Sequence, residues 1–304
     1  MKIKHLLFTI LSSSLLVACS SNNTSSDDDF IQSDSIIAPA SIEISKESMD
    51  DLIDNVSSPI EIASLLIDEK VPFNRDYIAT TDYIDDLVTD FDCALNLGIL
   101  GTDLGYLNLY EKTGSVMSTV SAINELASRL KVGQFFDFVL LKRLATNSNN
   151  LDSLIFTSIS SFNNMDDYLR SNNRTNVSAL IVSGVWLEST FLATQVYQNK
   201  TNKKIAERIG EQKLILNNLV LIMQNYNSDP RFKELLTDFG ELKKLFDEVK
   251  IVTVESDPVS KVENGMLVIV QTSKSDVIIT DEQIKKIGDL VSSLREKYIN
   301  KNNA

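Results

Sequence analysis

The chain has 304 residues, of which 42 are acidic and 29 are basic, and its net charge at neutral pH is −13. This balance argues against nucleic-acid binding, because that function requires a basic surface. The single histidine is His5. If the first residues are removed after export, the mature chain has no histidine. That excludes Ser-His-Asp and Cys-His catalytic systems and histidine-bound zinc, copper or haem.

Residues 1–18 are predicted to be an export signal. Lys2 and Lys4 give a basic start, and residues 6–16 form an apolar stretch. The stretch is too short to cross a bilayer, which needs about 20 apolar residues. A basic start followed by a short apolar run is typical of a segment that is processed and does not belong to the folded protein.

The signal ends in a sequence that resembles the lipobox of bacterial lipoproteins, formed by Leu16, Val17, Ala18 and Cys19. The resemblance implies that the chain is cut before Cys19 and that lipid is attached covalently to this cysteine. Several acyl chains anchor a protein stably, whereas a single chain gives only marginal binding. Loss of Lys2 and Lys4 lowers the basic count from 29 to 27, so the mature charge is −15. The other cysteine, Cys93, is predicted to be a buried apolar residue.

Residues 19–45 are predicted to be a flexible tether. They are rich in Ser, Asn and Asp and show no helical periodicity, so they cannot bury enough apolar surface to offset the entropy of ordering. A coil of this length spans roughly 25–30 Å. The expected location is therefore the cell envelope, with the body held near a membrane by the lipid. Ser20 and Ser21 give no retention signal for the inner membrane, so the outer membrane is preferred, with the leaflet left open.

Residues 46–248 are predicted to form a helical body, because apolar residues recur at helical spacing in one segment after another. Residues 176–199 are apolar on nearly every side, which is typical of a central buried helix. Glu188 and several hydroxyl groups make that segment too polar to span a membrane. Asp229 followed by Pro230 marks the start of a later helix as its N-cap and first residue.

The segment 81–112 is predicted to be helical, with one apolar stripe formed by Ile84, Leu87, Val88, Phe91 and Leu95. Its second half carries Gly98, Gly101 and Gly105. Glycines at this spacing remove side chains from one helix face, so that another backbone can approach closely. Alternatively, they mark a break between two helices.

Residues 249–304 are predicted to be a small α/β appendage packed on the body. Residues 249–255 and 266–273 are β-branched and alternating, and the turn-rich stretch between them indicates a hairpin. Thr280 and Gln283 fit a capping box at the start of a final helix.

The predicted fold is mainly α: an irregular multi-helix bundle with a small C-terminal β-hairpin plus helix. An α-solenoid is the alternative, but no repeat of fixed period is present. The body resembles uncharacterised helical envelope lipoproteins of bacteria in residues 97–130, 151–162, 180–190 and 208–213. This resemblance covers most of the body and implies no activity.

A candidate site is predicted where polar residues fall in otherwise packed helices. The proposed buried polar cluster consists of Asp103, Tyr106, Glu188, Arg170, Arg208 and Glu211, with Tyr110 in a similar setting. One interpretation is a pocket whose carboxylates meet a ligand or a proton. The other is a set of internal ion pairs and hydrogen bonds that satisfy a helical core. No metal ligand set and no cofactor other than the lipid on Cys19 is predicted.

Two functions follow from these observations. The first is a non-catalytic accessory lipoprotein that binds a protein partner at the envelope. The alternative is a small-molecule or glycan binder, or a carboxylate-based enzyme, built around Asp103 and Glu188. Residues 128–131 and 112–114 match two short motifs of penicillin-recognising enzymes, but in reversed order and without the third motif. The chain is therefore not expected to be an enzyme.

Overall fold

The computed structural model describes residues 65–66, 69–145, 151–255, 259–263, 266–270 and 273–299. These residues all belong to one compact unit, Ser41–Ala304, and a second unit comprises Met1–Ala40. The predictions for the export signal, for Cys19 and for the tether fall outside the described residues, as does the start of the predicted helical body before residue 65.

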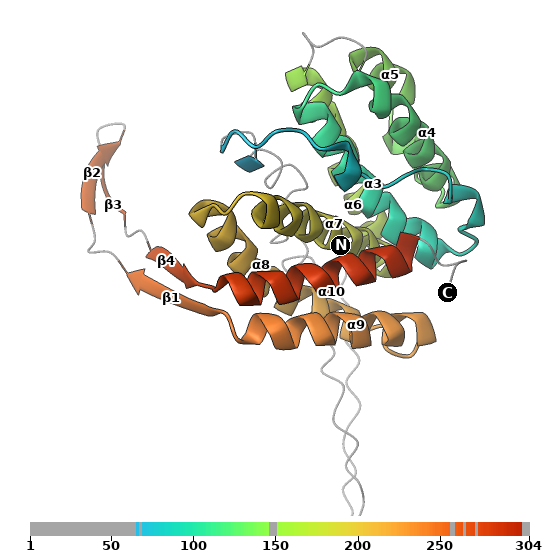
Figure 1. Cartoon of the computed structure of the whole chain (residues 1–304). Coiled ribbons are helices and arrows are strands. Elements are labelled where there is room, and N and C mark those ends of the chain that lie inside the picture. Colours follow the sequence, from blue (N-terminus) through green and yellow to red (C-terminus); the bar gives the residue numbers. More distant parts are fainter. Residues whose placement is uncertain are drawn as a thin grey trace, which may run out of the picture. The chain divides into compact units, whose positions relative to one another are not determined.

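The described chain is mainly helical, with a small antiparallel sheet near its C-terminal end followed by a last helix, which confirms the predicted fold class (Figure 1). Three short 3-10 helices are η1 (Arg75–Tyr77), η2 (Ile84–Asp86) and η3 (Gly133–Phe135). The α-helices are α3 (Asp90–Leu109), α4 (Thr113–Arg129), α5 (Phe138–Ala145), α6 (Leu151–Ser171), α7 (Thr175–Asn199), α8 (Lys203–Gln224), α9 (Pro230–Asp247) and α10 (Asp281–Ile299). The strands are β1 (Lys250–Glu255), β2 (Val259–Glu263), β3 (Met266–Val270) and β4 (Ser273–Ile278).

Helix α7 is the central helix of the bundle, as its sequence predicts. It packs on α3, α6, α8 and α10, which lie around it in Figure 1. Among the described residues, α7 is the helix that is long and apolar enough to cross a membrane. However, 94% of its apolar window is buried inside the fold. Its apolar character is therefore explained by its place in the core of the bundle.

The arrangement is a bundle and not a solenoid. In a solenoid each repeat contacts only its neighbours along the chain. Here the most extensive helix contact joins α3 to α7, across the intervening α4, α5 and α6, and α10 also packs on α7. The α-solenoid alternative is therefore wrong for the described residues.

Glycines allow α3 and α7 to touch along their backbones. A Cβ atom on Gly98 would lie 2.0 Å from the carbonyl oxygen of Ile181, and one on Gly184 would lie 2.0 Å from that of Leu95. Helix α3 runs unbroken through its glycines. Close backbone approach is thus the correct one of the two interpretations, and a helix break is wrong.

The predicted apolar stripe is correct only in part, because α3 begins later than expected. Thr89 is the N-cap, and its hydroxyl accepts a hydrogen bond from the Asp92 amide. Ile84 and Leu87 are buried although they precede the helix, whereas Val88 is 88% exposed. A helical stripe over these residues is wrong at Val88, since the backbone there is not helical. Cys93 is buried, as predicted.

The sheet differs from the predicted hairpin in its pairing. Strand β1 pairs with β4, from Lys250 opposite Ile278 to Glu255 opposite Ser273. Strand β2 lies within the expected loop and pairs with β3. The two ladders differ in register by one residue, because three residues separate β1 from β2 and two separate β3 from β4. Asn264 and Gly265 stand between β2 and β3 in the sequence, a pair that favours a tight hairpin turn. The predicted pairing of 249–255 with 266–273 is therefore wrong.

Helix α10 contributes to the core of the bundle. Thr280 and Gln283 form the predicted capping box, in which each residue's amide donates to the other's side chain. The helix packs on α7 and α9 and touches α3. Its inner face, which includes Ile284, Ile287 and Val291, is buried in the same apolar core as the helices of the body.

The backbone contact between α3 and α7 predicts opposite effects for two glycine substitutions. Gly98→Ala should destabilise the protein by about 1–3 kcal/mol, because the new methyl group meets backbone atoms that cannot move independently. Gly240→Ala, in the middle of α9 with nothing near its Cβ position, should stabilise by about 0.5–1 kcal/mol. Urea unfolding of both variants measures the difference. Equal stability of the two variants would contradict the close approach.

Candidate functional site

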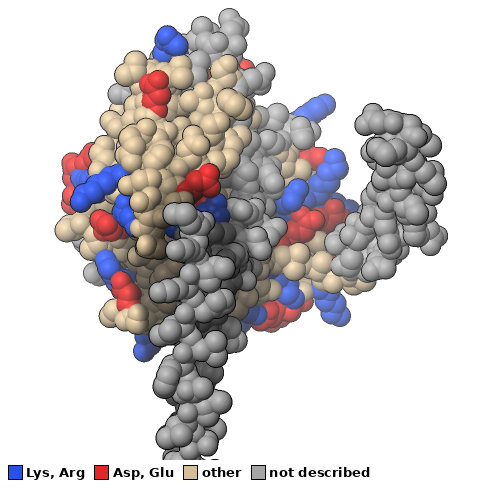
Figure 2. Space-filling view, turned by 180° about the vertical axis from the view of Figure 1, so that it is seen from behind, with Lys and Arg blue, Asp and Glu red and all other residues tan. Residues whose placement is uncertain are grey.

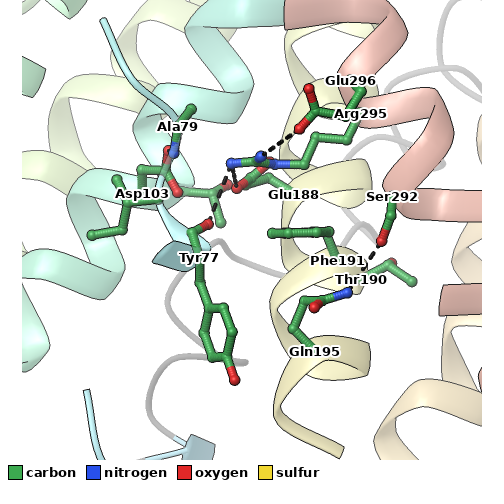
Figure 3. Close-up of polar contacts among 12 residues, drawn as sticks. Tyr77, Ala79, Asp103, Glu188, Thr190, Phe191, Gln195, Ser292, Arg295 and Glu296 are labelled. Atoms are coloured by element: carbon green, nitrogen blue, oxygen red, sulfur yellow. Dashed lines mark hydrogen bonds and ion pairs between the residues drawn. The ribbon is translucent and has the colours of Figure 1, made fainter. Parts of the chain in front are cut away.

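The polar centre of the bundle is formed by Asp103, Glu188 and Arg295, one residue from each of α3, α7 and α10 (Figure 3). Asp103 follows Gly98 by five residues and Glu188 follows Gly184 by four, so the close crossing of α3 and α7 brings the two carboxyl groups together. We call these three residues the buried carboxylate cluster.

Arg295 holds Glu188 with two hydrogen bonds. Its Nε lies 2.7 Å from Glu188 Oε2, and its Nη2 lies 2.8 Å from Oε1. The side chain of Arg295 is 5% exposed and that of Glu188 is fully buried. The guanidinium group also lies 4.2 Å from the centre of the Phe191 ring, where the negative face of the ring favours a cation. Two-point pairing of this kind is the strong form of a buried ion pair.

Asp103 is fully buried and lies next to the negative charge of Glu188. Its Oδ2 accepts a hydrogen bond of 3.0 Å from the amide of Ala79. Among the described residues, no donor reaches its Oδ1. Burial, and after it the charge of Glu188, raise the pKa of Asp103 well above the ordinary 3.8, although Arg295 opposes this shift.

Burial and the charge of Glu188 both favour the protonated form of Asp103. A protonated Oδ1 is a donor, and a hydrogen bond between the two carboxyl side chains contributes to the raised pKa of Asp103. Burial lowers the pKa of Arg295, but the charge of Glu188 and its hydrogen bonds raise it further, so the guanidinium group stays charged. When Asp103 is protonated, the buried carboxylate cluster holds one cation, one anion and one neutral acid, and so carries no net charge.

The structure places Tyr106 beside this cluster but bonds it elsewhere. Tyr106 lies one turn after Asp103 on α3, and its hydroxyl oxygen accepts a 3.0 Å hydrogen bond from the amide of Asn74. Tyr110 donates its hydroxyl proton to the carbonyl of Val71. The two tyrosines and Phe73 pack ring against ring.

The other predicted members lie apart from the buried carboxylate cluster. Arg170 pairs with Asp166, one turn earlier on α6, at 2.8 Å. Arg208 and Glu211 pair with each other at 3.0 Å on α8, and both side chains are more than a third exposed. The structure thus brings together Asp103 and Glu188 and sets Tyr106 next to them. It puts Arg170 in a separate, mostly buried ion pair on α6, and Arg208 and Glu211 in an exposed pair on α8.

Sequence reasoning missed Arg295, the partner on which the cluster depends. A signal was present: Arg295 is four residues after Val291 and three before Tyr298, and both lie on the buried face of α10. An arginine on an apolar stripe must meet an acidic partner, because burying an unpaired charge is strongly unfavourable.

The described residues offer little else for chemistry. A small hollow among α3 to α6 is lined only by apolar side chains, among them Leu104, Phe136 and Phe162, and does not include the buried carboxylate cluster. Within the described part of the chain, no group of three or more His, Cys, Asp or Glu side chains could hold a metal ion.

Comparisons with known proteins supply no further constraint. No protein-family model matches the chain, and neither a curated protein nor a solved structure matches it. The chemistry of the site therefore has to be argued from its geometry. Both oxygens of Glu188 are bonded to Arg295 and one oxygen of Asp103 is bonded to Ala79, so the geometry favours internal ion pairing over an open pocket.

The protonated state of Asp103 predicts a stability difference that grows with pH. In Asp103→Asn, the amide NH₂ can donate to Glu188 and the amide oxygen can accept from Ala79, so both contacts survive without a proton to lose. A raised folded pKa gives stability that is complete below 3.8 and is lost as pH rises towards the folded pKa. The free energy of unfolding of Asp103→Asn, relative to that of the wild type, should therefore rise by about 1.4 kcal/mol for each pH unit between 3.8 and the folded pKa. Urea unfolding from pH 4 to 8 measures this difference.

Glu188→Gln is the matched control, since it also replaces one carboxylate of the pair by an amide. It removes the anion bonded to Arg295 and should destabilise the protein by about 3 kcal/mol. If the two variants had the same effect at every pH, the assignment of the proton to Asp103 would be wrong.

Proposed function

We propose that this chain is a lipid-anchored protein of the bacterial cell envelope, and that its helical body is a non-catalytic accessory that binds a protein partner. The lipobox-like sequence ending in Cys19, at the foot of a short apolar run, supports the anchor. The location that fits best is the outer membrane, because Ser20 and Ser21 carry no inner-membrane retention signal.

The main support for a non-catalytic role is that the buried carboxylate cluster is closed to solvent. A catalytic or ligand-binding carboxylate needs access to its substrate, but Glu188 and Asp103 are fully buried and engaged with groups of the protein itself. This supports a structural role for the residues on which the binder or enzyme alternative depends.

Surface features favour a protein as the partner. Val139 on α5 is 81% exposed and Phe156 on α6 is 73% exposed, and large exposed apolar side chains commonly contribute to protein interfaces. On the face drawn in Figure 2, acidic and basic side chains are interspersed and form no basic patch. This distribution argues against a nucleic-acid partner.

The lipid anchor is tested by metabolic labelling with an alkyne fatty acid. The full-length protein should be labelled and should fractionate with the outer membrane. Cys19→Ala should lose the label, and Cys93→Ala, as the matched control, should keep it. A wild type that is unlabelled, or a Cys19→Ala variant that is labelled equally, would contradict the anchor.

Partner binding is tested by crosslinking in the native envelope, followed by purification of the wild type and of Cys19→Ala. We expect a stoichiometric protein partner with the anchored form, and loss of that partner from the unanchored form. Recovery of the anchored protein alone would contradict the accessory role and would favour the small-molecule or glycan binder. A ligand screen by thermal shift would then follow.

A further inference from the structure

Residues 71–79 form a strap over the helical bundle. The only regular element within these residues is the 3-10 helix η1. The strap starts after Lys70, whose φ of 54° lies in the left-handed region and turns the backbone. Ile78 and Ala79 at its end are buried, although they belong to no helix or strand. The strap has no ladder of main-chain hydrogen bonds to a neighbour, so side-chain contacts attach it. Its own apolar side chains take part, because Val71, Tyr77, Ile78 and Ala79 are buried in the core of the bundle. The side-chain amide of Asn199 on α7 also donates to the hydroxyl of Tyr77.

Four side chains of α3 and α10 hold the main chain of the strap. Tyr110 donates to the carbonyl of Val71, and Tyr106 accepts from the amide of Asn74. The other two contacts come from the buried carboxylate cluster: Arg295 Nη2 donates to the carbonyl of Tyr77 at 3.3 Å, and Asp103 accepts from the amide of Ala79. Figure 3 shows Tyr77 and Ala79 beside Asp103 and Arg295.

The charged and titratable groups around Asp103 come from every element that packs on it. Glu188 lies on α7, and Arg295, with Glu296 beyond it, lies on α10. Three tyrosines add to this environment: Tyr77 in the strap, Tyr83 just before η2 and Tyr106 on α3. Of these groups only Arg295 is a cation, and it is already paired with Glu188.

We propose that the strap is a proton-controlled cover: the proton held between Asp103 and Glu188 keeps residues 71–79 closed over the buried carboxylate cluster, and its loss releases them. The argument is one of charge. If Asp103 is ionised while the strap is closed, two buried anions share one cation, and burying an uncompensated charge is costly. Opening the strap admits water to both carboxylates and removes that cost.

The strap is the element best able to open, because it can leave without unfolding a helix. Local opening of one segment exposes less surface than global unfolding and therefore has a lower free energy. The Ala79 amide favours the ionised form of Asp103, but burial and the charge of Glu188 outweigh it and raise the pKa of Asp103. Opening is therefore coupled to release of one proton from Asp103.

Hydrogen exchange of the folded body tests the proposal. Protection of the strap amides, corrected for the pH dependence of chemical exchange, is measured by mass spectrometry from pH 5 to 8. One proton released per opening predicts that strap protection in the wild type falls as pH rises, by about tenfold per pH unit wherever Asp103 is protonated in the closed form and ionised in the open form. In Asp103→Asn it should stay constant, because the amide has no proton to release in this range.

Tyr106→Phe is the matched control, since it removes a strap contact that does not titrate in this range. Its strap protection should be lower than in the wild type at every pH, with an unchanged slope. Wild-type strap protection that shows no slope would overturn the proposal, as would an Asp103→Asn variant that keeps the wild-type slope. Strap amides as protected as those of α9 at every pH would also overturn it, because the strap would then open only on global unfolding.

Discussion

The backbone contact between α3 and α7 is the constraint on which the rest of the bundle depends. Gly98 and Gly184 leave no room for side chains at the crossing, so the two helices approach more closely than ordinary packing allows. This contact joins segments about 85 residues apart. Of the intervening helices, α4 packs on α3, α6 packs on both α3 and α7, and α5 packs on α4 and α6, while α8 and α10 pack on α7.

The same crossing creates an electrostatic problem and determines how it is solved. It buries Asp103 and Glu188 next to each other, and two adjacent carboxylates cannot both stay ionised in a site without water. Arg295 from α10 neutralises Glu188, and burial together with the charge of Glu188 favours the protonated form of Asp103. The last helix of the described chain, α10, is therefore tied to the central helix α7 by charge as well as by apolar contact. A further hydrogen bond between Gln195 and Ser292 strengthens this link.

Sequence reasoning succeeded where the signal is local and repeated. The central position of α7 follows from its apolar character on all sides, and the helix starts at Asp229 and Thr280 follow from capping chemistry. It failed where local patterns compete with pairing or capping. Val88 fits an apolar stripe, but Thr89 caps α3 just after it and leaves Val88 exposed. The sequence pattern predicts that residues 266–270 pair with β1, yet they pair with β2, because strand pairing depends on turn geometry as well as on the apolar pattern.

The sequence by itself determined the mainly α class, most helix positions and the two carboxylates worth examining, because helical periodicity and polar residues in apolar helices are local properties. It also supplied the lipobox-like sequence at Cys19, on which the proposed anchor rests. Only the tertiary structure decided that Asp103 and Glu188 meet, that Arg295 joins them and that Arg170, Arg208 and Glu211 do not. The reason is physical: periodicity tells which face of a helix is buried, but the charge partner of a buried side chain depends on helices that come together only in the folded chain.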